Sequence, residues 1–125
     1  MIRVMLLCAL WLSISTIPSL AHHSYALYDM RSAQSFSGEV ERVEWVNPHI
    51  IISLRPDDRT NTVWRIEGHA PVLLARNGFD RTQLKVGDQI RISFHPLRQG
   101  QGGSLDSLTV SDGRTFNRFG VLQPS

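Results

Sequence analysis

The stretch "FSGEVERVEW", residues 36–45, alternates apolar and polar residues but changes face halfway along. Successive side chains of a β-strand point to opposite faces, so the apolar residues of one face share one parity. Here the parity changes near Glu41 and Arg42. The apolar set is Phe36, Gly38 and Val40 before the change, and Val43 and Trp45 after it. A β-bulge inserts one residue and bends the strand. Because long, bent first strands are typical of small closed barrels, the stretch predicts that fold.

The rest of the chain predicts four further strands and one helix. Residues 50–54 and 62–68 alternate as two strands around the turn "RPDDRTN" (55–61). Pro71 fits the first turn of a helix, Gly78 fits its end, and Asp80 with Gln83 predicts a cap on one further turn. The stretches "QIRISFHPL" (89–97) and "LDSLTVSDGRTF" (105–116) supply the last strands, and residues 117–125 stay unassigned. The predicted inward residues are Ile50, Ile52, Leu54, Trp64, Ile66, Ile90, Ile92, Phe94, Leu108 and Val110.

The predicted order is strand, strand, strand, helix, strand, strand. The fold class is therefore all-β with one short helix, and the order is that of the OB-fold, a five-stranded Greek-key barrel. The alternative is another small open barrel or roll.

Residues 1–21 have the features of a secretory signal peptide. Arg3 precedes an apolar run over residues 4–12, and "SLA" (19–21) has the small-x-small pattern of a cleavage site. Hydroxyl residues at 13, 15 and 16 interrupt the run, whereas a membrane-spanning helix needs roughly 20 apolar residues. We expect a mature chain that begins at His22, is periplasmic or secreted, and keeps no stable membrane anchor.

Cleavage would leave 104 of the 125 residues, which is enough for a single domain. Residues 22–35 lack a period and predict an extended arm, and residues 36–125 predict the barrel. Arg3 is one of 13 Lys and Arg residues, so 12 remain against 11 acidic ones. This near neutrality argues against nucleic-acid and electrostatic membrane binding. The single cysteine, Cys8, lies in the signal segment, so we expect no disulfide.

Four blocks resemble a known family: "AHHSYALYD" (21–29), "GEVERVEWVNPH" (38–49), "WRIEGHAPVLLARNGF" (64–79) and "LKVGDQIRISFHPLRQG" (84–100). Together they are similar to a group of small exported bacterial proteins catalogued as a domain of unknown function, with the same "HHS", "NPH" and "LxRxG" blocks. The resemblance implies export but no activity. His69 departs from it, because a small residue is expected between Gly68 and Pro71. A role for His69 therefore cannot be carried over.

His22 would carry both a ring and a free α-amine, whose pKa is ordinarily about 7.7 to 8.0. The amine and the ring Nδ1 can chelate one metal ion, and one further imidazole would complete a three-nitrogen arrangement resembling the histidine brace of copper proteins. Nitrogen ligands in a near-planar array favour Cu(II). We expect His49 as the third ligand because it stands beside Pro48 at the start of a strand. His23 and His95 are reserve metal ligands.

Each histidine also has a simpler interpretation. His22 and His23 would then be a polar arm, His49 would bond the neighbouring turn, and His95 would be an outward polar residue. His69 would cap the helix or face solvent. Glu67 near a histidine suggests a general base, but a pairing with Arg65 or a loop amide is the default expectation. Trp45 and Trp64 are expected in the core.

Three functions follow from these patterns. The first is a non-catalytic exported binding protein with a copper site. The second is a metal-free interaction module that holds an extracytoplasmic protein or small ligand through the loops 55–61 and 98–104. The third, a copper-dependent redox enzyme, has the weakest support, since it would also need an open substrate face. Ser24 and Ser104 lack a visible base and acid for nucleophilic catalysis.

Overall fold

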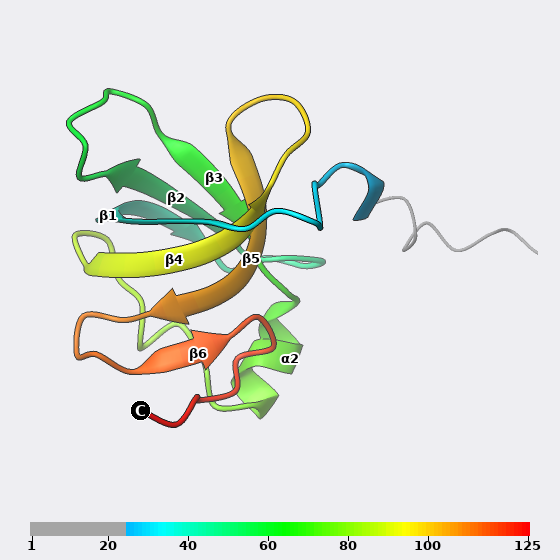
Figure 1. Cartoon of the computed structure of the whole chain (residues 1–125). Helices are drawn as coiled ribbons and strands as arrows, with labels where there is room; N and C mark the ends of the chain where they lie inside the picture. Colours follow the sequence, from blue (N-terminus) through cyan, green and yellow to red (C-terminus); the bar gives the residue numbers. More distant parts are fainter. Residues whose placement is uncertain (1–24) are drawn as a thin grey trace, which may run out of the picture.

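The computed structural model describes residues 25–125 as a small barrel with one short helix (Figure 1). The predicted signal peptide and the start of the arm lie outside these residues. The elements are β1 (Gln34–Glu44), β2 (Ile51–Pro56), β3 (Trp64–Glu67), α2 (Pro71–Arg76), β4 (Gln89–Pro96), β5 (Gly102–Thr109) and β6 (Thr115–Asn117). In the described residues, no helix is long and apolar enough to cross a membrane.

Five strands close the barrel in the order predicted for an OB-fold. β1 pairs with β2 on one side and β4 on the other, β2 continues to β3, and β4 continues to β5. A parallel pairing of β3 with β5 closes the ring. The prediction of three strands, a helix and two strands is confirmed. A short sixth strand, β6, follows the turn at Asp112 and Gly113 and pairs with β5 outside the ring. Thr115 and Phe116 belong to the stretch assigned to the fifth strand, and only Asn117 belongs to the unassigned end.

The bulge predicted in the first strand is present. Val40 pairs with Leu54 and Arg42 pairs with Ser53, so Glu41 is the extra residue. Its carboxylate pairs with Arg55 of β2, whose Nε lies 2.6 Å away. The bend lets β1 pair with β4 along its first half and with β2 along its whole length beyond Gly38. β1 therefore contributes hydrogen bonds to both halves of the barrel, to β4 through its first half and to β2 through its second.

The core fills the inside of the barrel. The predicted inward residues of β2 and β4, together with Leu108 and Val110, are all at most 4% exposed. Burial of one such aliphatic or aromatic side chain contributes about 1.5–3 kcal/mol. Trp45 packs on Phe79 at 5.8 Å between ring centroids, and Trp64 packs on Phe94 at 5.5 Å. Both tryptophans are partly buried against the core, as predicted.

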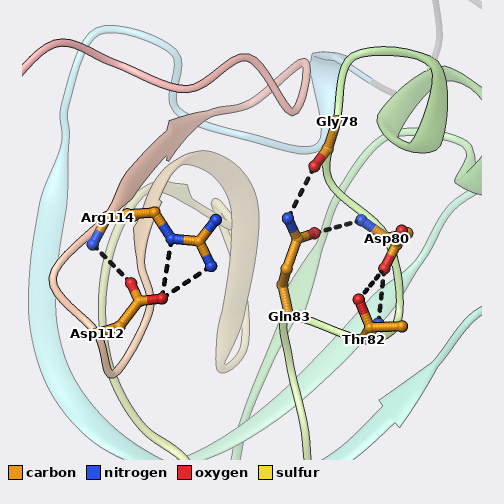
Figure 2. A network of polar contacts seen from close by, with 6 residues as sticks. All are labelled: Gly78, Asp80, Thr82, Gln83, Asp112 and Arg114. Carbon is orange, nitrogen blue, oxygen red and sulfur yellow. Dashed lines mark hydrogen bonds and ion pairs between the residues drawn. The ribbon is translucent and has the colours of Figure 1, made fainter.

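The helix α2 lies at one end of the barrel, beside the C-terminal segment (Figure 1). Pro71 occupies its first turn, and Gly78, with φ of 97°, follows its end in the left-handed region. The predicted cap over Asp80 and Gln83 is present: the Asp80 amide donates to Gln83 Oε1 at 2.6 Å, and the Thr82 amide donates to Asp80 Oδ1 at 2.8 Å (Figure 2). These contacts order the connection from α2 to β4.

The described part of the arm is docked on the barrel. It begins with a helical turn at residues 25–27. Tyr28 then forms an isolated bridge with Leu97, and the Asp29 amide donates to the Pro96 carbonyl at 2.8 Å. The Arg98 amide donates to the Leu27 carbonyl at 2.9 Å. The arm therefore follows the end of β4 before it turns into β1.

Candidate functional site

Two side chains from separate parts of the chain, Tyr28 and His49, meet at Glu67, the last residue of β3. The Tyr28 hydroxyl of the arm donates to Glu67 Oε2 at 2.6 Å. The other oxygen, Oε1, lies 2.5 Å from Nδ1 of His49, which precedes β2. Tyr28 is buried, whereas 38% of the His49 side chain is exposed. We call Tyr28, Glu67 and His49 the Glu67 corner, because they join the arm to the β1–β2 connection at the surface.

Backbone pairing continues past the ends of β2 and β3 and holds His49 in place. Ile51 is paired with Glu67. The Ile50 amide donates to the His69 carbonyl at 3.1 Å, and the Gly68 amide donates to the Ile50 carbonyl at 2.9 Å. A Cβ at Gly68 would lie 2.7 Å from Ile50 Cγ1, so this close approach requires glycine. Ile50, the residue after His49, is fully buried and is hydrogen-bonded through both its amide and its carbonyl.

The hydrogen bonds at Glu67 determine which atoms carry protons. Burial raises the pKa of Tyr28 above its ordinary value of 10.0, and the hydrogen bond to Glu67 and its negative charge raise it further. The phenol therefore stays protonated and donates. An ionised carboxylate only accepts, so the contact places a proton on His49 Nδ1. A metal ion bound by this ring has to use Nε2. Carboxylates commonly orient metal-binding histidines through the opposite nitrogen in this way.

His69 lies near the corner but makes a different contact. Its ring stacks on Phe119 of the C-terminal segment, with ring centroids 5.0 Å apart and an angle of 30° between the planes. Burial lowers its pKa, and the charges of His49 and Arg118 lower it further. The residue before α2 is Ala70, and no side chain caps the helix. The prediction that His69 caps the helix is therefore wrong, and the ring remains partly exposed beside Phe119 of the C-terminal segment.

His95, a predicted reserve metal ligand, lies on β4 and forms a hydrogen bond that holds the arm against this strand. Its Nδ1 lies 2.8 Å from the Ser32 carbonyl, which can only accept, so Nδ1 donates. Its Nε2 is 3.9 Å from Asp106 Oδ1, and 16% of the side chain is exposed. His95 lies on the outward parity of β4, next to the buried Phe94, as the alternative interpretation predicts, and the arm covers most of its side chain from outside. The contact of the His95 ring with the main chain of the arm indicates a structural role.

No group of three His, Cys, Asp or Glu side chains that could hold a metal ion occurs within residues 25–125. His49 and His95 therefore do not belong to such a group in this range. The other two predicted ligands, His22 and His23, lie outside the described residues. A three-nitrogen site would have to recruit them.

Tyr28 is the corner residue that the sequence patterns did not reveal. It belongs to a stretch without periodicity, in which apolar and polar residues are mixed, so no pattern distinguishes Tyr28 from its neighbours. The default expectation that Glu67 pairs with Arg65 or a loop amide is also wrong. Arg65 Nη2 instead lies 3.5 Å from Glu44 Oε2 on β1, while Glu67 bonds His49 and Tyr28. Alternation along one strand places residues on a face but does not identify partners on other strands.

Fold and corner together define a small OB-type barrel whose N-terminal arm is docked through a Tyr–Glu–His contact. A family model described as a family of unknown function, DUF6152, matches residues 10–106, and the chain belongs to this family. No curated protein matches the chain.

One solved structure is similar, described as the crystal structure of the ZRD-deleted mutant of TiaS in complex with agmatine. The TM-score is 0.50 at 10% sequence identity, and the match covers 69% of this chain but 26% of that protein. This chain thus spans about a quarter of the length of that protein. The likeness shows the fold alone.

Proposed function

We propose that this protein is an exported, non-catalytic binding protein that holds a copper ion between its N-terminal residue and the Glu67 corner. After cleavage behind Ala21, the α-amine and ring of His22 would supply two nitrogens, and His49 Nε2 the third. Copper(II) is the ion expected for such a nitrogen set. The observation that supports this most is the Glu67 carboxylate on His49 Nδ1, at 2.5 Å.

The corner has the properties that a metal-binding ring needs. The ring is held by Glu67, which in turn is held by the buried Tyr28. These two contacts limit the rotation of the His49 ring before a metal ion arrives, so less conformational entropy is lost when the ion binds. Partial exposure of His49 keeps the ring accessible to an incoming ion. A histidine that merely bonded a neighbouring turn would have no need for a carboxylate fixed from a second segment.

The length of the arm is compatible with this arrangement. Tyr28 touches the same carboxylate as His49, so it marks where the arm meets the corner. His22 is six residues before Tyr28. Residues 25–27 form a helical turn, which rises about 1.5 Å per residue, and the residues before it can add at most about 10 Å, so the reach from the Tyr28 backbone is roughly 15 Å. The proposal requires the ring of His49 to lie within this reach.

Titration with Cu(II) tests the proposal in three samples. They are the processed protein beginning at His22, the same protein with three residues added before His22 so that no histidine falls at the third position of the chain, and a synthetic peptide of residues 22–31. We expect one ion per processed protein, much weaker binding after the addition, and weaker binding by the peptide, which lacks His49. The addition of three residues after Ser125 is the matched control and should change nothing.

Two results would contradict the proposal. Equal affinity of the extended protein would show that the α-amine is not a ligand. Equal affinity of the peptide would show that the barrel contributes nothing, and the metal-free interaction module would then be the better account.

A further inference from the structure

A hollow lies at the other end of β3, away from the Glu67 corner. Its volume is about 270 Å³, and it opens between the start of β1, the end of β2 and the turn that leads to β3. It is lined by Phe36, Ser37, Pro56, Asp57, Asp58 and Trp64. Trp64 begins the strand that Glu67 ends, so the two places are separated by the length of β3.

Two aromatic rings form firm walls of this hollow. The rings of Phe36 and Trp64 have centroids 5.6 Å apart and planes at 59°. Behind them the fully buried Phe94 contacts both, at 5.6 Å from Phe36 and 5.5 Å from Trp64. The two outer rings are only partly buried, so part of each remains available to a ligand. Aromatic faces carry negative potential and attract cations.

Two carboxylates stand at the rim. The amide and hydroxyl of Thr60 donate to Asp58 Oδ1 at 3.0 and 2.7 Å, and these bonds lower the pKa of Asp58. Asp58 is therefore ionised at neutral pH. Asp57 accepts a long hydrogen bond of 3.4 Å from Gln89 Nε2. Among residues 25–125, no lysine or arginine lines the hollow, so this lining combines negative charge with aromatic surface.

We propose that this hollow binds a small organic cation of the quaternary ammonium class. Such a cation has no N–H groups to satisfy, so the aromatic walls can surround its methyl groups while the carboxylates balance its charge. A primary ammonium has three donors that the aromatic rings cannot satisfy. The volume of the hollow suits a trimethylammonium head and not a large ligand. This site is independent of the copper proposal, because it shares no residue with the Glu67 corner.

Calorimetric titration with choline, and with its neutral isostere 3,3-dimethylbutan-1-ol, tests the inference on the purified protein. The two probes have the same shape and differ in charge. We expect saturable choline binding and an affinity for the alcohol that is weaker by about tenfold. Equal affinities would overturn the proposal by showing an apolar hollow without charge recognition, and so would the absence of saturable choline binding at millimolar concentrations.

The double variant Asp57→Asn, Asp58→Asn removes the charge and keeps the turn. Each asparagine retains an acceptor oxygen for Thr60 or Gln89, so the fold should persist. We expect choline affinity to fall by about fivefold to tenfold. The matched control is Asp106→Asn, which removes a half-exposed carboxylate that does not line the hollow. An equal loss in both proteins would overturn the assignment, because it would reflect net charge alone.

Discussion

His49 and His95 each stand beside a proline near the end of a strand, but their rings contact different kinds of acceptor. His95 Nδ1 donates to the main-chain carbonyl of Ser32, and the side chain is 16% exposed. His49 Nδ1 contacts the carboxylate of Glu67, and the side chain is 38% exposed. The first contact joins two backbone segments. The second orients a ring that solvent can still reach.

This difference shows that similar local sequence does not determine the role of a histidine. A neutral carbonyl partner suits a histidine with a structural role, since it adds no charge to the contact. A carboxylate partner suits a ligand, because it fixes the tautomer that leaves Nε2 for a metal. The two histidines therefore predict opposite effects of substitution: His49 should affect copper binding, and His95 should affect stability.

The largest expected effect is the loss of copper binding when His49 is replaced. We predict that His49→Ala lowers the Cu(II) affinity of the processed protein by more than about a hundredfold, because one of three ligands is lost. His95→Ala should leave the affinity within error. Competition titration against a chelator of known affinity measures both. If the two variants lost affinity equally, the distinction between the histidines would fail.

Glu67→Gln tests the carboxylate itself. Glutamine replaces one of the two carboxylate oxygens with an NH2 donor, so Tyr28 and His49 can no longer each donate to an oxygen of their own. We predict about a tenfold loss of Cu(II) affinity, as is usual for an outer-shell partner. Glu44→Gln is the matched control, because Glu44 pairs with Arg42 and Arg65 and should not affect the metal. Unchanged affinity of Glu67→Gln would show that the contact does not position the ring.

His95→Ala should loosen the arm. The lost hydrogen bond and packing are expected to lower the free energy of unfolding of the metal-free protein by about 1–2 kcal/mol. Hydrogen exchange should also accelerate at the Asp29 amide, which donates to Pro96. Under the same conditions, His49→Ala should have at most half of this effect. A greater loss of stability in His49→Ala would reverse the comparison.

The smallest effect concerns alkaline pH. The pKa of Tyr28 is raised in the folded protein, so the unfolded chain loses this proton first as the pH rises above the ordinary value of 10.0. The free energy of unfolding should therefore decline above that pH. Tyr28→Phe should show a shallower decline in denaturant unfolding at several pH values, with Tyr25→Phe as the control. An identical decline in wild type and Tyr28→Phe would show that the buried phenol is not responsible.

The barrel could be predicted from sequence because its signals are local. The parity change at Glu41 identified the bulge, and Pro71 with Gly78 bracketed the helix. The sixth strand escaped detection since three residues are too few to show a period. The Glu67 corner escaped because its partners are 18 and 39 residues away in the chain. No periodicity reports which residues on other segments a side chain will contact.

The central claim is that cleavage frees the nitrogen of His22 and that this nitrogen binds copper with the Glu67 corner. Native mass spectrometry of the exported protein, before and after addition of Cu(II), tests it most directly. The account predicts a chain that starts at His22 and gains the mass of one copper ion. A chain that starts at any other residue, or one that starts at His22 and gains no copper, would contradict it.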